Sequence, residues 1–577
     1  MRQNKRLHRL AAMVLALAVL LTALSGCGGG AANIEAFQTK AEALRQAVLA
    51  DQVLAELAEN PAGEKAKYAV FLSVSDGSER AEVHHGTGST PEAAWDTALK
   101  KASAAVKKSG RFPLWVKADL VYVSASLSAA ALEGIGEMFG PYDFRYGLAF
   151  DPGYGTALLE TELNTNHIYD YEKGGVDLER LNAYLEESDR ATLKALPEEY
   201  TAFQCAGWLC GEDGNVVALS LEGTQQGRRE TAAVDNSMAL ALALDSAEFL
   251  AEQVQEDGSI LLPGADGPLN AARHADVLSA MVRGYQLHSG DGLAGGIDRA
   301  AGWLAGRMAY AEEDLAFLPE NGEITLESLA LGVIALADCA EASGEEAYTP
   351  ACTALGAGML SLLDTGTGTF THVLDASDLS RKEAFRSAQW DGMGVTALCR
   401  LYGLTKDSLW LWAAQQVMDR MVQGDPGDQD VWTAYALREI TKYARDRTDY
   451  FVFALKNAQG SLASIYSAQG TAPAGLEMLA VSYETYRGML DAGYSTDGFE
   501  LPLLLEVIYA RAERQLDGYL FPEYAMYFEE PQRVLGAFMN REAGLSISAE
   551  EMCRNIGGYC LYAANYENFE ADRAKES

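Results

Sequence analysis

WDGMGVTALCRLYGLTKDSLWLWAA, the stretch from Trp390 to Ala414, predicts the fold of most of this chain. Its first half, GMGVTALCRLY, is apolar on most sides, whereas its second half keeps Lys406 and Asp407 beside the apolar Trp410. A helix that is apolar all round lies inside a protein, and an amphipathic helix lies at its surface. The stretch therefore predicts an inner helix that is followed directly by an outer helix.

The same alternation extends in both directions along the chain. ADVLSAMVRGY (275–285) and ESLALGVIALADCA (327–340) are apolar on most sides, and the segment between them carries Asp298, Arg299 and Arg307. Six hairpins of alternating inner and outer helices bury every apolar face when they close into a double ring. The chain is therefore predicted to be mostly α-helical, with an α/α toroid over 231–570. Apolar residues at steps of three and four predict its twelve helices near 233–255, 270–289, 292–309, 325–342, 346–363, 390–403, 406–422, 430–446, 449–458, 473–490, 500–516 and 551–566.

A small α+β domain is predicted over 67–200, before the ring. AVFLSVSDG and RAEVHHGTG alternate as a strand pair, and STPEAAWDTALKKASAAVKKSG is helical with Ser89 or Thr90 as its N-cap. A hairpin is expected at 201–230 and is interpreted as a bridge to the ring. Residues 28–66 are predicted to form a helical tether.

The first 27 residues are typical of a secretory signal that ends in a bacterial lipobox. Basic residues precede the apolar run AAMVLALAVLLTAL, and LSGC follows it at 24–27. The run is too short for an ordinary membrane span. We therefore expect a lipid on Cys27 that anchors the protein to the membrane in an extracytoplasmic location. A plain signal anchor with a coincidental cysteine is the alternative.

The formal net charge is −37, from 45 basic and 82 acidic residues. The electric field of such a negative charge repels nucleic acid and anionic lipid, so no nucleic-acid partner is predicted. It also disfavours a polyanionic substrate unless a local basic pocket holds one. A solvated surface explains the composition without any partner.

The cysteines and histidines show no metal-ligand spacing. Apart from the lipobox cysteine, seven of the eight cysteines remain, and an odd number cannot all pair within the chain. Cys339, Cys352 and Cys399 lie in apolar helical runs and are interpreted as buried free thiols, although a bridge such as Cys205–Cys210 stays open. The pair His84–His85 has no third ligand nearby. No metal and no cofactor are predicted.

Four segments give the region 231–570 a resemblance to a known superfamily. They are QEDGSILLPGADG (255–267), NAARHADVLSAMVRGYQL (270–287), GGIDRAAGWLAGRM (295–308) and the stretch from Trp390 to Ala414. Together they resemble the α/α toroid of the six-hairpin glycosidases. Related toroids hydrolyse, eliminate or epimerise polysaccharides, so the resemblance implies a carbohydrate-active protein. Terpenoid cyclases share the shape, but no DxDD run like their acid motif is present.

In such a toroid, the turns that enter the inner helices surround one mouth of the barrel. A sugar site needs two carboxyl groups as acid and base, and aromatic faces for the ring. Helix N-termini also favour carboxylates through the helix dipole. The turns carry suitable residues: Asp257, Asn270, Arg273, His274, Glu320, Glu323, Glu327, Glu383, Arg386, Gln389, Trp390, Asp391, Asp430, Trp432 and Tyr435.

Among these residues, the predicted catalytic carboxylates are Glu327, Glu383 and Asp391. Each has a structural alternative: Glu383 or Asp391 can cap a helix or pair with a neighbouring arginine. Burial would raise the pKa of Glu327 unless Arg273 pairs with it. Arg273 with His274 can equally form a buried ion network, and Trp390 can pack in the core. The predicted substrate-binding residues are Arg273, His274, Arg386, Gln389, Trp390, Trp432 and Tyr435.

The sequence leaves three functions open. The preferred one is an anchored glycoside hydrolase that acts on a polysaccharide or envelope glycan. The second is a polysaccharide lyase or uronate epimerase, in which His274 or Tyr435 moves the C5 proton and Arg273 neutralises the carboxylate. The third is a non-catalytic lipoprotein that binds envelope glycan or assists its assembly, with 67–200 as a module that docks a protein partner.

Overall fold

The computed structural model describes residues 29–51, 68–139, 144–171, 174–221, 226–231, 233–344, 346–382, 385–424 and 430–576. The chain divides into two compact units. Unit 1 comprises Met1–Glu230 with Leu520–Leu535, and unit 2 comprises Thr231–Tyr519 with Gly536–Ser577. The prediction of a mostly helical chain with a small sheet-containing region is confirmed.

Unit 2 contains, within its described residues, one α-helix for each of the twelve expected segments. Two of them extend past the expected ends at 458 and 566, because Leu462 and Phe569 are buried in their later turns. The helices are α8 (Asn236–Glu252), α9 (Ala271–Leu287), α10 (Asp291–Gly306), α11 (Leu326–Ser343), α12 (Thr349–Leu360), α13 (Ala388–Thr405), α14 (Ser408–Met421), α15 (Val431–Tyr443), α16 (Thr448–Ser467), α17 (Ala474–Asp491), α18 (Leu501–Gln515) and α20 (Ala549–Glu576).

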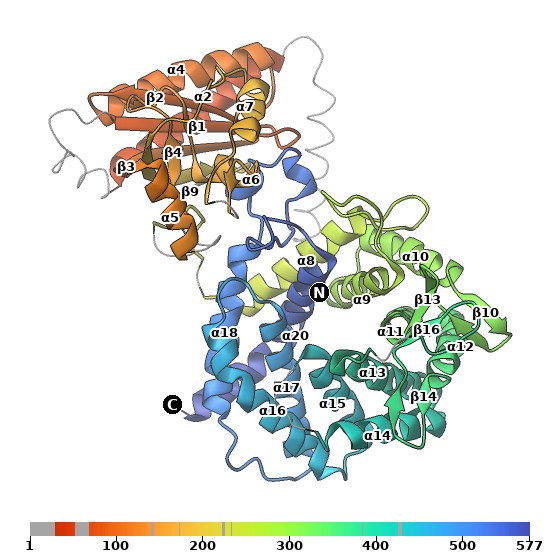
Figure 1. Cartoon of the computed structure of the whole chain (residues 1–577). Coiled ribbons are helices and arrows are strands. Elements are labelled where there is room, and N and C mark those ends of the chain that lie inside the picture. The colour runs from red at the N-terminus through yellow and green to blue at the C-terminus, as the bar shows by residue number, and fades with distance from the viewer. Residues whose placement is uncertain are drawn as a thin grey trace, which may run out of the picture. The chain divides into compact units, whose positions relative to one another are not determined.

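Six of these helices form a closed inner ring (Figure 1). In ring order they are α9, α11, α13, α15, α17 and α20, each packed on the next, and α20 returns to α9. The other six lie outside the ring. In α11 nearly every side chain from Leu326 to Ala340 is buried, as its apolar sequence requires. The predicted α/α toroid of six hairpins is therefore confirmed.

The alternation of inner and outer helices gives all six inner helices the same direction. Their first turns therefore meet at one end of the ring, which we name the N-terminal mouth. Asn270, Thr325 and Asp430 cap α9, α11 and α15 there by accepting backbone N–H groups. Short strands in the connections to α11 and α13 were not predicted: β10 (Ala309–Glu312), β11 (Leu315–Phe317), β12 (Pro319–Glu320), β13 (Glu323–Thr325), β14 (Leu363–Asp364), β15 (Thr369–Phe370) and β16 (Val373–Asp375).

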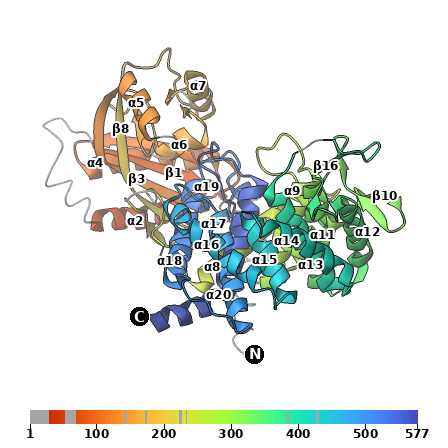
Figure 2. The same cartoon turned by 60° about the horizontal axis from the view of Figure 1, so that its bottom comes forward.

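Unit 1 is built on an antiparallel sheet in the order β2-β1-β3-β8-β4-β5, with β9 beside β8. Helices α2 and α4 pack on one face of this sheet (Figure 2). On that face Leu44 and Trp95 share a core with Val116 and Trp208. The strands are β1 (Tyr68–Ser75), β2 (Glu82–Gly88), β3 (Trp115–Ser128), β4 (Gly147–Ala149), β5 (Ala157–Leu158), β8 (Glu199–Cys210) and β9 (Val216–Ala218), with β6 (Tyr169–Asp170) and β7 (Gly175–Val176) forming a separate pair. The helices are α2 (Gly29–Ala50), α4 (Pro91–Ser109), α5 (Ala129–Phe139), α6 (Glu160–Thr165), α7 (Leu178–Glu187) and α19 (Pro522–Ala525).

Two predicted boundaries differ from the structure. Helix α2 was expected in a spacer over 28–66, but its apolar stripe, including Phe37 and Leu44, is buried in the core of unit 1. The hairpin over 201–230 does form, since β8 pairs with β9. However, β8 lies inside the sheet between β3 and β4, so this segment belongs to unit 1 and is not a separate bridge.

Several sequence predictions concern residues that the structure does not describe. Cys27, with the signal segment, and Glu383 lie outside the described residues. Among the helices that the structure describes, none combines the length and apolarity that crossing a bilayer requires. The seven cysteines of the described residues are free thiols, and all but Cys205 are buried.

The segment Leu520–Leu535, which we name the strap, covers the second face of the sheet in unit 1. Tyr527 is fully buried there against Phe71 and Phe203. Its hydroxyl lies 2.8 Å from Ser73 Oγ and accepts from Lys117 Nζ at 3.5 Å. The strap thus completes a core that the sequence places almost three hundred residues earlier.

Replacing Tyr527 with phenylalanine is expected to lower the free energy of unfolding by roughly 1–2 kcal/mol, because the buried Ser73 and Lys117 each lose a polar partner. Urea unfolding of the whole chain measures this change. Tyr466→Phe is the matched control, because that side chain is half exposed, and it should change stability by less than about 0.5 kcal/mol. Identical unfolding curves for the two variants would contradict the role of the strap.

Candidate active site

Three charged side chains meet at the N-terminal mouth. Arg273, in the first turn of α9, has its Nη2 atom 3.7 Å from Glu327 Oε1 and 3.9 Å from Glu550 Oε2. Glu327 lies in the first turn of α11 and Glu550 in the first turn of α20, the two ring neighbours of α9. Because both oxygens lie within 4 Å of one nitrogen, the two carboxylates are less than about 8 Å apart.

The two carboxylates have different environments. The side chain of Glu327 is 19% exposed, whereas that of Glu550 is 64% exposed. Burial raises the pKa of Glu327; Arg273 opposes this shift, and Asp276 and Glu550 add to it. A carboxyl group with a raised pKa can donate a proton, while an exposed carboxylate beside it can reach water.

One turn further into the ring, a buried charge network crosses the axis. Arg554 of α20 donates to Asp276 of α9 at 2.8 Å and to Glu477 of α17 at 2.7 Å. Arg283 of α9 donates to Glu477 and to the hydroxyl of Tyr435, both at 2.8 Å. Helices α9 and α15 lie on opposite sides of the ring, so the bond between Arg283 and Tyr435 spans its bore. We name these five residues the axial network.

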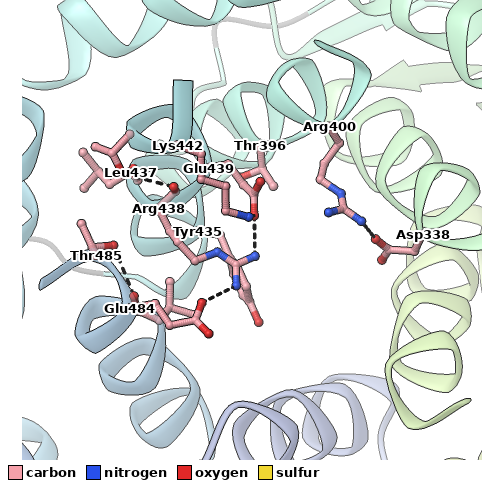
Figure 3. A network of polar contacts seen from close by, with 12 residues as sticks. Asp338, Thr396, Arg400, Tyr435, Leu437, Arg438, Glu439, Lys442, Glu484 and Thr485 are labelled. Carbon is pink, nitrogen blue, oxygen red and sulfur yellow. Dashed lines mark hydrogen bonds and ion pairs between the residues drawn. The ribbon is translucent and has the colours of Figure 1, made fainter. Parts of the chain in front are cut away.

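Beyond the axial network, the inner helices line a cavity of about 230 Å³, which we name the axial cavity. Figure 3 shows Arg400 paired with Asp338 on one side of this space, and Arg438 with Glu439 and Glu484 on the other. A cavity of this size can hold water or one small molecule. Its wall includes Arg283, Asp338, Arg400, Trp432, Tyr435, Arg438 and Glu439.

The charges on this wall neutralise one another. Burial alone would raise the pKa of Glu439, but Arg438, Lys442 and Arg400 together lower it to about 2. Lys442 Nζ donates to Glu439 at 2.7 Å. The wall therefore carries charges of both signs without a large excess of either.

Asp391 faces a different space from Glu327. On α13, Gln389, Thr396 and Arg400 are spaced by seven and four residues, so they share the face that lines the axial cavity. Asp391 instead lines a cavity of about 270 Å³ beside α14 and α16, with Phe453 on its wall. The expectation that Asp391 acts beside Glu327 is therefore wrong, because the two side chains lie on opposite sides of the inner layer.

Asp391 has a structural role that the sequence left open as an alternative. Its carboxylate accepts from His372 Nε2 at 3.1 Å and from Arg386 Nη2 at 2.6 Å. His372 Nδ1 in turn accepts the backbone N–H of Ser387 at 3.0 Å, and Arg386 donates to the carbonyl of Phe370 at 3.0 Å. Asp391, His372 and Arg386 thus tie the connection before α13 to its first turn.

His274 does not face the bore. Its ring stacks on Trp303 with centroids 4.2 Å apart, and its Nε2 lies 2.9 Å from the carbonyl of Ala300, so it packs between α9 and the outer helix α10. Burial lowers its pKa to about 4. The predicted contact of His274 with substrate is therefore wrong.

The predicted aromatic residues fall into two groups. Trp432 and Tyr435 are buried on the axial cavity, with Arg554 over the Trp432 ring at 5.1 Å. Trp390 is partly exposed at the start of α13 and packs edge-on against Phe385, whose side chain is 46% exposed. Trp390, Phe385 and the exposed Gln389 can therefore contact a ligand at the mouth, whereas Trp432 cannot without entering the bore.

Glu550 and four members of the axial network were not predicted from the sequence. A single ionisable residue inside an otherwise apolar helix was the available signal, as for Asp276 in ADVLSAMV and Glu477 in LEMLAV. Such residues are seldom buried without a partner. Within the described residues, no three metal-binding side chains cluster, and no histidine lines the axial cavity.

Replacing Glu551 with glutamine is expected to make the stability of unit 2 less dependent on pH. Burial, helped by Glu550 and Glu542, raises the pKa of Glu551 to about 7 from 4.5. The folded protein keeps this proton up to near pH 7 and the unfolded chain loses it near 4.5, so stability falls as pH rises through that window. At pH 8 the variant should be more stable than the parent by roughly 1–3 kcal/mol, and at pH 4 the two should agree. Urea unfolding at both pH values tests this, and parallel pH profiles would contradict it.

No protein-family model and no curated protein matches this chain. Solved structures are similar to it. A D-mannose isomerase is 11% identical, with a TM-score of 0.43 over 59% of this chain and 99% of that one. A cellobiose 2-epimerase from Spirochaeta thermophila is 11% identical, with a TM-score of 0.44 over 57% of this chain and 97% of that one. An α-mannanase of glycoside hydrolase family 76 from Bacteroides thetaiotaomicron is 13% identical, with a TM-score of 0.41 over 58% of this chain and 97% of that one.

Proposed function

We propose that unit 2 hydrolyses glycosidic bonds at the N-terminal mouth, with Glu327 as the proton donor and Glu550 as the second carboxylate. The observation that carries the proposal is that both carboxylates flank the guanidinium of Arg273, at 3.7 and 3.9 Å. Glycoside hydrolysis uses two carboxyl groups about 5–9.5 Å apart, one protonated and one ionised. A separation below about 8 Å fits this requirement.

Each residue has a defined role in this proposal. Glu327, whose pKa is raised by burial, protonates the leaving oxygen, and Arg273 stabilises the carboxylate that remains. Glu550 either attacks the anomeric carbon or activates a water. Trp390 and Phe385 offer partly exposed aromatic faces to a sugar ring. The anomeric configuration of the first product distinguishes attack by Glu550 from activation of water.

Elimination or epimerisation is less well supported. Of the two residues predicted to move the C5 proton, His274 is packed against Trp303. The hydroxyl of Tyr435 donates to Glu477 at 2.6 Å, and burial raises its pKa, so it is a poor base. We also propose that the lipid predicted on Cys27 holds the enzyme at the extracytoplasmic face of the membrane.

The test is an activity screen of the whole chain and of a Glu327→Gln, Glu550→Gln double variant on neutral and uronate-containing polysaccharides. New reducing ends that the double variant fails to produce would support hydrolysis. Absorbance growth at 235 nm would instead indicate elimination and would overturn the proposal. Binding without turnover on every substrate would favour the non-catalytic alternative.

A further inference from the structure

A basic surface on unit 1 contrasts with the acidic composition of the chain. Residues 100–111, KKASAAVKKSGR, contain five basic residues and no acidic one, whereas the whole chain has a net charge of −37. Four of the five are exposed lysines on α4, and the fifth follows the helix. We name them the α4 basic face: Lys100, Lys101, Lys107, Lys108 and Arg111.

The lysines form two parallel rows. Lys100 and Lys107 are seven residues apart, as are Lys101 and Lys108, so each pair lies on one side of the helix. Seven residues of α-helix span about 10.5 Å. The surface therefore repeats its positive charge at about that interval along the helix axis, which suits a linear ligand with regularly spaced anionic groups.

Part of the face has no partner within the protein. Lys101 donates to the carbonyl of His85 at 2.8 Å, and Lys108 lies 3.4 Å from the exposed Asp189. Arg111 pairs with Glu79 at 2.5 Å and lies 3.8 Å from Asp76. Lys100 and Lys107 have no hydrogen bond or ion pair with any residue that the structure describes. Compensation of the helix dipole accounts for lysines in the last turn of α4, but Lys100 lies two turns before it.

A groove of about 880 Å³ runs beside the face in unit 1, with Lys101, Lys108 and Arg111 on its wall. This concavity favours a polymer chain over a membrane, since a bilayer surface is flat. Phe112, which follows the face, is exposed, but a single ring adds little to membrane binding. The groove also contains acids that pair with its basic residues, such as Glu187 with Arg80 at 2.6 Å and Asp189 with Lys108 at 3.4 Å. The net attraction therefore comes from Lys100 and Lys107, which lie on α4 outside the wall of the groove.

We propose that the α4 basic face, with the adjoining groove, binds a linear acidic polysaccharide. The choice of a glycan over another polyanion rests on the function proposed for unit 2; the binding of a polyanion does not. The interaction would let a protein of strong negative charge hold an acidic polymer, which its overall field repels.

The experiment measures binding of the whole chain to fluorescently labelled oligogalacturonate at low salt. A Lys100→Glu, Lys107→Glu variant is compared with Lys194→Glu, Lys456→Glu, which changes the net charge equally at two exposed lysines outside the face. We expect the first variant to bind at least about tenfold more weakly than the parent, and the second less than about threefold more weakly. The affinity of the parent should also fall steeply as salt is added.

Other ligands complete the test. Equal weakening in both variants, or binding of neutral dextran with the same affinity, would overturn the proposal. Preferential binding of inorganic polyphosphate or of phosphatidylglycerol vesicles would show a different ligand and would also overturn it. Polymer binding without turnover of any glycan would leave this inference standing and remove the proposed hydrolase. Turnover of a glycan without polymer binding would overturn this inference and leave the proposed hydrolase standing.

Discussion

Replacing Glu477 with leucine is expected to lower the free energy of unfolding of unit 2 by about 3–5 kcal/mol. Its carboxylate is fully buried and accepts from Arg554, Arg283 and Tyr435 at 2.6–2.8 Å. Removing it leaves two guanidinium groups inside the ring without their shared counter-charge. Desolvation of an unpaired charge is the largest single cost that a substitution in this network can impose.

Urea unfolding of the whole chain measures this loss. Glu506→Leu on the outer helix α18 is the control, because its side chain is exposed, and it should change stability by less than about 0.5 kcal/mol. The double variant Glu477→Leu, Arg554→Met should lose less stability than the sum of the losses of the two single variants, because the two side chains are partners. Strict additivity would contradict the axial network.

Replacing Glu327 with glutamine is expected to reduce kcat on an ordinary glycosidic bond by about 10²–10⁴-fold. Glutamine keeps the shape of the side chain but has no proton to donate to the leaving oxygen. An aryl glycoside with a strongly acidic phenol needs no such proton, so on that substrate the loss should be less than about tenfold. Steady-state kinetics on the two substrates measure the difference. Equal losses on both would show that Glu327 does not act as the acid.

The pH profile gives a second check on the role of Glu327. A proton donor must be protonated, and burial raises the pKa of Glu327, so activity should persist above the ordinary range of a glutamate and then fall as pH rises further. The variant should lack this alkaline limb on the activated substrate. An alkaline limb that survives in Glu327→Gln belongs to another group.

The ring was predictable because buried helices and surface helices differ in the pattern of their apolar residues. The inner helices α9, α11 and α13 are apolar on most sides, and α10 and α14 keep a charged face. That contrast determines which helices lie inside without any knowledge of side-chain contacts. The strands before α11 and α13 have only two to four residues, too few to show a period.

The site was harder to predict because it depends on helical phase and ring closure. Asp391 follows Gln389 by two residues, yet the two lie on opposite faces of α13. Glu550 meets Arg273 only because the last inner helix packs against the first. A list of ionisable residues in the right turns cannot distinguish those that face the bore from those that face the outer layer.

The boundaries of unit 1 show a similar limit. Helix α2 has the apolar stripe of a packed helix, but its partner strands begin after the next segment of chain. The strap supplies Tyr527 to a sheet that is complete in sequence before residue 220. Sequence patterns show which faces are apolar, and they do not show which distant segment covers them.

The proposed role of Glu327 is tested most directly by the kcat of Glu327→Gln beside that of Asp391→Asn, on the best substrate from the activity screen. Both changes are isosteric, and both carboxylates lie near the start of an inner helix. We expect a loss of at least about 10²-fold for Glu327→Gln and less than about tenfold for Asp391→Asn, whose carboxylate holds His372 and Arg386. A large loss for Asp391→Asn with near-normal activity for Glu327→Gln would contradict it.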